Sequence, residues 1–178
     1  MVVKTKPPDS CTHAAPLPQV RARVLIVEGR FYEAIADELA AGAIAALEAQ
    51  GASYDRVSVP GALEIPQALA QAVAAGLIPR SGANAKWDGA VALGCVIRGE
   101  TAHYDIVCNN ANHWLMEVAM RDAVPVGNGI LTVETEAQAM ERAQGGADGK
   151  GGDAARACLR LIELARAYQG QEAQGLGA

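Results

Sequence analysis

The chain has 178 residues and a formal net charge of −5, and 51% of its residues are hydrophobic. This length suits one domain with a sizeable core. The acidic balance argues against a nucleic-acid-binding domain, because such domains are usually basic, and no apolar run approaches the length of a transmembrane helix.

Residues 1–20 are predicted to form a flexible N-terminal arm. Four of the eight prolines fall there, at positions 7, 8, 16 and 18, and the segment lacks the continuous apolar stretch of a secretory signal. We expect a single domain over residues 21–170, a C-terminal tail over 171–178 and a cytoplasmic location. The four cysteines lack CxxC spacing, so neither a zinc site nor a redox dithiol is predicted.

Strands and helices alternate along the rest of the chain. Short β-branched or apolar runs predict strands, and longer Ala-rich stretches with helical periodicity predict helices. In chain order the expected elements are a strand at 22–28, a helix at 31–51, a strand at 55–60, a helix at 63–76, a strand within 87–97, a helix at 104–121, a strand at 124–133, a helix at 134–143, a glycine-rich hinge at 144–152 and a helix at 153–169.

Two local features support these helices. Thr135 is a plausible cap for the fourth helix. In the third helix, Val107, Ala111, Trp114 and Val118 are spaced four, three and four residues apart, which predicts one helical face.

Strands that are nearly all apolar and alternate with helices indicate a parallel sheet covered on both faces. We therefore predict a three-layer α/β/α sandwich of the α/β class, with a four-stranded parallel sheet of flavodoxin-like type. In open sheets of this kind, ligands bind at the carboxyl ends of the strands. The residues that follow each predicted strand are therefore the first candidates for a site.

After the first two strands, the candidates are Phe31 and the stretch "PGALE", residues 60–64. Phe31 is the only phenylalanine in the chain and could stack on a planar ring, although, taken alone, a packing staple at a helix start explains it better. Glycine in "PGALE" permits close backbone approach. Glu64 falls in the first turn of a helix, where a carboxylate is favoured in any case.

The third strand ends in the most informative stretch, "ALGCVIRGETAHYD", residues 92–105. Gly99, Glu100 and Thr101 lead into a predicted helix, and free N–H groups at a helix start can bind an anion. His103 follows directly, and imidazole groups suit proton transfer near neutral pH. A capped helix start with a surface histidine explains the same residues about equally well.

The remaining histidines and cations are ambiguous on their own. His113 lies four residues before Glu117, which indicates a solvated pair, and the three histidines are too far apart to suggest a metal site. Arg142 and Lys150 could each hold a phosphate, but a surface salt bridge explains each of them equally well.

Six stretches in order carry a family resemblance: "RFYEAIADEL", "VPGALEIP", "ALGCVIRGETAHYD", "VPVGNGILTVET", "QAMERA" and "GKGGDAA". Together they resemble the lumazine synthase family, the 6,7-dimethyl-8-ribityllumazine synthases of riboflavin biosynthesis, from about residue 23 to about residue 168. The resemblance implies a flavodoxin-like fold and a transferase. Its reaction joins 5-amino-6-(D-ribitylamino)uracil to 3,4-dihydroxy-2-butanone 4-phosphate, releases water and phosphate, and uses no metal or organic cofactor.

The resemblance also implies roles for individual residues, with His103 as the catalytic proton-transfer residue. The pyrimidine and ribityl groups would be bound by Phe31, Ala62, Leu63, Glu64, Val96, Ile97 and Asn128. The phosphate would be bound by Gly99, Glu100, Thr101, Arg142 and Lys150. Asp153 would be a supporting acidic residue near the histidine. Asn128 and Arg142 would come from a neighbouring subunit.

Some positions depart from the family pattern. Tyr32 stands where many members have Asn, Leu63 where many have Phe, and Asn128 where many have an aromatic residue. The implied partners are the two small-molecule substrates and other copies of the chain in a homopentamer, with neither nucleic acid nor membrane. Whether pentamers assemble further, into decamers or icosahedral shells, is left open by the hinge and the arm.

Two other functions fit parts of the pattern. One is a catalytically weak paralogue that binds flavin or builds a shell, and the other is a different phosphosugar-binding domain of the same fold. A paralogue of the first kind could have lost Thr101, His103 or Arg142, and all three are present here. The ordered set of motifs disfavours the second.

Overall fold

The computed structural model describes residues 20–78 and 85–175. The predicted arm lies outside the described residues except for Val20, and so do residues 176–178 of the predicted tail.

The centre of the molecule is a four-stranded parallel sheet with the order β2-β1-β3-β4. Its strands are β1 (Arg23–Gly29), β2 (Ser53–Val59), β3 (Gly89–Ile97) and β4 (Val126–Val133). The two central strands are almost entirely buried, because helices cover both of their faces. β2 lies at an edge and is half exposed, which agrees with its more polar sequence.

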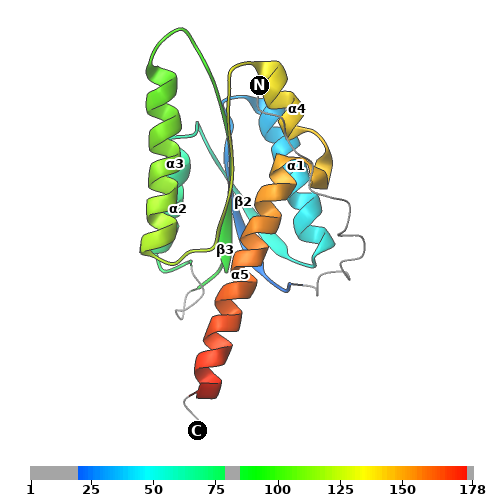
Figure 1. Cartoon of the computed structure of the whole chain (residues 1–178), viewed down its shortest axis with the longest axis vertical. Coiled ribbons are helices and arrows are strands. Elements are labelled where there is room, and N and C mark those ends of the chain that lie inside the picture. Colours follow the sequence, from blue (N-terminus) through cyan, green and yellow to red (C-terminus); the bar gives the residue numbers. More distant parts are fainter. Residues whose placement is uncertain (1–19, 79–84, 176–178) are drawn as a thin grey trace, which may run out of the picture.

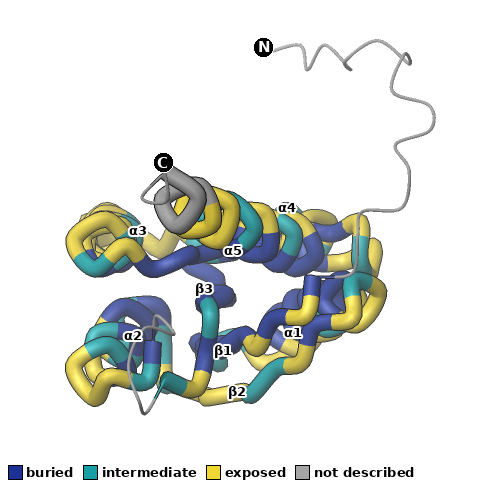
Figure 2. Tube along the Cα trace, turned by 90° about the horizontal axis from the view of Figure 1, so that it is seen from below, coloured by how far each residue is buried: buried dark blue, intermediate teal, exposed yellow. Residues whose placement is uncertain are grey.

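Helices cover the sheet in two layers, as Figure 1 shows. One layer consists of α1 (Glu33–Ala49), α4 (Glu136–Ala143) and α5 (Lys150–Gly175), with the short 3-10 helix η1 (Gly146–Asp148) between the last two. The other consists of α2 (Glu64–Ala74) and α3 (His103–Arg121). Each layer encloses its own apolar cluster against the sheet, and the buried side of each helix in Figure 2 faces inward. The predicted three-layer flavodoxin-like fold is confirmed.

Helix boundaries agree with the sequence to within about two residues, except around the glycine-rich hinge and at the end of the last helix, where α5 continues to Gly175 into the predicted tail. Thr135 caps α4 as predicted, since its Oγ1 accepts a hydrogen bond from the backbone N–H of Gln138 at 3.2 Å. The hinge is shorter than predicted, because α5 already begins at Lys150. Gly151 lies so close to the backbone of Leu39 in α1 that a Cβ would collide with the Leu39 carbonyl. The glycines there serve close helix packing.

The predicted face of α3 is only partly correct. Ala111 and Val118 are buried as expected, but Trp114 is 52% exposed and Leu115 is fully buried in its place. The bulky indole therefore lies on the outer surface of the helix. No helix in the described parts of the chain is long and apolar enough to cross a membrane.

Candidate active site

A cavity of about 270 Å³ opens at the carboxyl ends of β1, β2 and β3, where the fold predicts a ligand site. Four segments that are distant in the sequence converge on it: the β1–α1 junction, the β2–α2 turn, the end of β3, and the loop and first turn of α3. Its lining residues are Phe31, Tyr32, Gly61, Ala62, Leu63, Glu64, Cys95, Val96, Ile97, Gly99, Thr101, His103, Tyr104 and Val107.

Phe31 forms one wall of the cavity and is 73% exposed. A phenylalanine this exposed contributes little to the core, so its ring is available to cover a planar ligand. The neighbouring Tyr32 packs against it edge to face, with ring centroids 5.0 Å apart and an interplanar angle of 71°. The simple packing-staple interpretation of Phe31 therefore does not hold.

The turn between β2 and α2 supplies a second wall. Its backbone folds tightly, with Glu64 N–H donating to the Gly61 carbonyl and Ile65 N–H to the Ala62 carbonyl, both at 3.3 Å. Gly29 at the end of β1 lies against Gly61 so closely that a Cβ on Gly29 would be 3.0 Å from the Gly61 backbone. This close approach places Ala62, Leu63 and Glu64 at the cavity.

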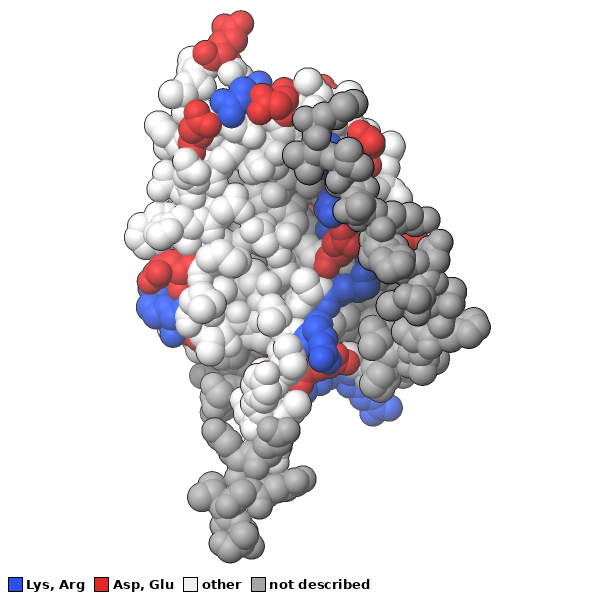
Figure 3. Space-filling view, viewed as in Figure 1, with Lys and Arg blue, Asp and Glu red and all other residues white. Residues whose placement is uncertain are grey.

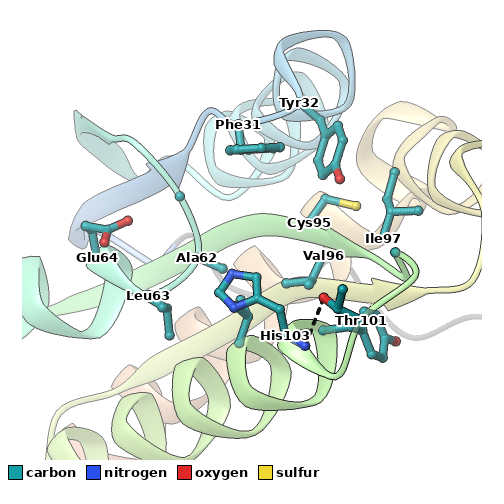
Figure 4. A pocket seen from close by; sticks show the side chains of 14 residues that line it. Phe31, Tyr32, Ala62, Leu63, Glu64, Cys95, Val96, Ile97, Thr101 and His103 are labelled. Carbon is teal, nitrogen blue, oxygen red and sulfur yellow. Dashed lines mark hydrogen bonds between the residues drawn. The ribbon is translucent and has the colours of Figure 1, made fainter.

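The third wall comes from the end of β3 and the start of α3. Val96 and Ile97 are the last strand residues, and Gly99 and Thr101 lie in the following loop. The backbone N–H of His103 donates to Thr101 Oγ1 at 3.4 Å, a local bond that shapes the entry into α3. In Figure 4, Phe31 and His103 lie on opposite sides of the cavity, and Val96 lies beside His103.

The part of the cavity surface formed by Cys95 and Tyr32 is uncharged at neutral pH. Burial raises the pKa of the Cys95 thiol to about 12, so this group stays protonated. Burial also raises the pKa of Tyr32, with smaller contributions from Cys95 and Glu136. A neutral surface of this kind suits a planar ring, while polar groups stand at the rim.

Four predicted site residues lie away from this cavity. Asn128 in β4 pairs with Ala92 of β3, which lies four residues before Val96. The side-chain amide of Asn128 donates a hydrogen bond to Asn112 Oδ1 at 2.7 Å. Arg142, Lys150 and Asp153 line a second, polar cavity of about 250 Å³ beside η1. There, a salt bridge at 2.8 Å joins Lys150 to Asp153, and this hydrogen bond is the main reason why the pKa of the Asp153 carboxyl is lowered.

Glu100 lies in the loop beside Gly99 but does not line the first cavity. The remaining predicted residues, apart from the four just described, all do. Five lining residues were not predicted as contacts: Tyr32, Gly61, Cys95, Tyr104 and Val107. Tyr32, Gly61, Cys95 and Tyr104 stand within the stretches quoted in the sequence analysis. Nothing marked the Cys95 side chain itself as a lining group, because every position of β3 is apolar or small and no alternation shows which side meets the cavity.

Metal binding finds no support in the described residues, among which no group of three or more His, Cys, Asp or Glu side chains could hold an ion. The chemistry available at the first cavity is that of one imidazole, one carboxylate, one thiol, the hydroxyls of Thr101, Tyr32 and Tyr104, and the N–H groups at two helix starts.

Comparison with known proteins identifies the family of this site. The family model described as 6,7-dimethyl-8-ribityllumazine synthase matches residues 21–166. The chain belongs to the 6,7-dimethyl-8-ribityllumazine synthase family. Among similar proteins, those of Azorhizobium caulinodans (57% identical over 149 residues, covering 84% of this chain and 90% of the relative), Methylobacterium radiotolerans (54%, covering 84% and 85%) and Agrobacterium fabrum (50%, covering 84% and 99%) are all named 6,7-dimethyl-8-ribityllumazine synthase.

The family match spans all the elements that line the first cavity. It also includes the segment from Arg142 to Asp153, which lines the second. Both cavities therefore lie within the region shared with lumazine synthases.

Proposed function

We propose that the cavity at the ends of β1, β2 and β3 is where this chain condenses 5-amino-6-(D-ribitylamino)uracil with 3,4-dihydroxy-2-butanone 4-phosphate. The products are 6,7-dimethyl-8-ribityllumazine, inorganic phosphate and water. The observation that carries the proposal is the convergence of Phe31, Glu64, Thr101 and His103, from four separate segments, on one cavity of a chain that belongs to this family.

Different walls of the cavity bind different parts of the substrates. Phe31 stacks on the pyrimidine ring, and the backbone of Val96 and Ile97 pairs with the polar edge of that ring. Ala62, Leu63 and Glu64 bind the ribityl chain at the start of α2. This arrangement is supported by the neutral cavity surface at Cys95 and by the exposed ring of Phe31.

The phosphate of the butanone lies at the start of α3, where Gly99, Glu100 and Thr101 offer N–H groups and a hydroxyl. His103, on the opposite side from Phe31, transfers protons between the two substrates. The amine of the pyrimidine attacks the ketone and water leaves to form an imine. Loss of a proton then expels phosphate. The second amine attacks the carbonyl that tautomerisation leaves behind, and a second water departs as the ring closes. General acid–base help from one imidazole contributes about 10²–10⁴ in rate, and positioning of the two substrates supplies much of the rest.

The site needs a second copy of the chain, because Arg142, Lys150 and Asn128 do not line the cavity of their own chain. We place these residues at the cavity of the neighbouring subunit, where Arg142 and Lys150 bind the phosphate, Asp153 supports them, and Asn128 covers the ring. A homopentamer is the assembly expected for the family. The cytoplasmic location remains a prediction from the sequence.

The surface around α3 supports such an assembly. Ile106, Trp114 and Met120 are 55%, 52% and 82% exposed on this helix, which is unusual for large apolar side chains in a monomer. Figure 3 shows a broad face, seen from the side of α3 and α5, whose charged side chains stand mostly at its edges. Burial of this face against other copies would remove the exposed apolar area from water.

The test is absorbance-monitored formation of the lumazine from the two purified substrates, with light scattering after size exclusion on the same sample. We expect product only when both substrates are present, and a mass near five chains. A folded protein that forms no product but binds flavin would instead be the weak paralogue considered above.

A further inference from the structure

The guanidinium of Arg98 bridges the loop that lies between the end of β3 and the start of α3. Its Nη2 lies 3.3 Å from Asp105 Oδ1 in the first turn of α3, and its Nε lies 2.8 Å from Glu134 Oε2 just after β4. The planar group also lies over the ring of Tyr104, 4.0 Å from the ring centroid. One side chain therefore connects the two ends of the loop and ties both to the next strand.

The loop itself has few other restraints. Residues 99–103 are all exposed, and a Cβ on Gly99 would meet nothing within 4 Å. The bonds that shape it are local ones, from His103 N–H to Thr101 Oγ1 and from Asp105 N–H to the Ala102 carbonyl. Arg98 makes the only side-chain ion pairs among the described residues that join the loop ends to one another and to β4.

Arg98 is not free to act as a phosphate ligand. Its side chain faces two carboxylates, so the local charge of the three groups sums to −1, which would repel a phosphate. Arg98 is also absent from the cavity lining, whereas its stacking partner Tyr104 belongs to it. Its effect on the site must therefore act through the residues it holds.

We propose that Arg98 is a positioning residue, which fixes Thr101 and His103 relative to the walls of the cavity through its contacts with Tyr104, Asp105 and Glu134. This inference rests on the proposed function of the cavity. The planar guanidinium of arginine can stack on a ring and bind two carboxylates at once, whereas the ammonium group of lysine cannot.

The main test is Arg98→Lys, which keeps the positive charge but loses the stacked fork. We expect about a tenfold rise in KM for the butanone phosphate and about a tenfold fall in kcat, because small misplacements of catalytic groups cost up to about a hundredfold. KM for the pyrimidine should change less than about twofold, because Phe31 and the start of α2 are untouched. A matched control is Arg160→Lys, which alters an exposed pair with Glu163 on α5 and should leave all three constants unchanged.

Glu134→Gln separates positioning from direct phosphate binding. If Arg98 positions the loop, weakening its anchor raises KM for the butanone phosphate by a few fold. If Arg98 were a phosphate ligand, removing a competing carboxylate would lower that KM. A lowered KM in Glu134→Gln, or an unchanged KM and kcat in Arg98→Lys, overturns the inference.

Two further measurements keep the outcomes distinct. Thermal unfolding of each variant shows whether the fold is retained, and Glu134→Gln is the milder change should Arg98→Lys prove unstable. An inactive wild-type protein would overturn the proposed function and this inference together. An active wild type with normal Arg98→Lys kinetics would overturn the inference alone.

Discussion

Arg56 donates two hydrogen bonds to the buried carboxylate of Glu28, from Nε to Oε1 at 3.0 Å and from Nη2 to Oε2 at 2.9 Å. The two residues lie on neighbouring strands of the sheet, and Glu28 is only 2% exposed. Arg30 and Ser58 complete the set of donors, at 3.2 and 3.3 Å. A buried charge of this kind is tolerated because every oxygen has partners. This hydrogen-bond network also fixes the end of β1, two residues before Phe31.

Glu28→Gln should therefore destabilise the fold. The change leaves the guanidinium of Arg56 facing a neutral amide and forces at least one donor onto a poorer partner. We expect the free energy of unfolding to fall by about 2 kcal/mol in urea denaturation, since Arg56 is partly exposed and water offsets part of the loss. Glu163→Gln breaks an exposed pair with Arg160 and should cost less than about 0.5 kcal/mol. Equal losses in the two variants would contradict the importance of the buried network.

Asp55 should make stability depend on pH. Its Oδ2 accepts from Trp87 Nε1 at 2.7 Å and faces Arg23 at 2.9 Å and Lys86 at 3.4 Å. The hydrogen bond from Trp87 is the largest reason why the pKa of the Asp55 carboxyl is lowered in the folded chain. A carboxyl with a lowered pKa stabilises the fold above its ordinary value and loses this contribution as pH falls through the lowered value.

Asp55→Asn should accordingly reduce the urea midpoint at pH 7. The gap between the variant and the wild type should narrow as pH drops below about 4, where the unfolded carboxyl takes up its proton. Midpoints measured at several pH values test this expectation. A gap that stays constant from neutral to acid pH would mean that the charge of Asp55 does not contribute.

Mixed assemblies test whether each site is shared. His103→Ala should lower kcat by about 10²–10⁴ without abolishing turnover, and Arg142→Ala should raise KM for the butanone phosphate much more than for the pyrimidine. Co-expression of the two variants in equal amounts creates sites in which an intact His103 faces an intact Arg142 from the next subunit. In a closed ring with random order, about one quarter of the sites regain both groups.

The co-expressed sample should therefore recover about one quarter of wild-type activity at low butanone phosphate, far above either variant alone. Simple mixing of the purified variants, without subunit exchange, is the control and should show only their average. Absence of recovery in co-expressed assemblies of normal mass would place Arg142 at its own chain's cavity or at none.

Gly127→Ala should disrupt the docking of α5 on β4. A Cβ at this position would collide with the Ala154 carbonyl, which is backbone and cannot move aside without shifting the helix. We expect a loss of about 3 kcal/mol or more in unfolding free energy, or failure to fold. Gly170→Ala is the control. Gly170 lies on α5, and a Cβ there would meet nothing within 4 Å, so this change should be neutral or slightly stabilising. Normal stability of Gly127→Ala would show that α5 can move away from β4 at little cost.

Local sequence patterns predicted the order of the elements well, because apolar runs and caps are properties of neighbouring residues. The start of β2 at Ser53 was placed two residues late, since it is defined by pairing with Arg23 on another strand. Trp114 was placed on the inner face because an apolar residue at the correct spacing looks the same in the sequence whether it faces the core or the outer surface. Periodicity alone does not distinguish these two cases.

For the site, the rule that ligands bind at strand ends led to Phe31, Thr101 and His103 because parallel strands end at one edge of the sheet. It did not lead to Cys95, whose strand is buried on both faces and shows no alternation. The separation of Arg142 from this cavity also follows from tertiary packing, since α4 lies on the opposite layer from α2 and α3. The residues alone left Arg142 open between a phosphate ligand and a surface salt bridge, and the family resemblance favoured the phosphate.

The glycine-rich turn beside α1 has a consequence for ligand affinity. Gly42 meets the backbone of Gly146, and Gly151 meets that of Leu39, so η1 and the start of α5 are fastened to α1 without intervening side chains. The chain between Arg142 and Lys150 thus gives up its conformational freedom when the protein folds. If Arg142 and Lys150 bind phosphate as proposed, ordering this segment subtracts little from the binding free energy, because the segment is already ordered in the folded chain.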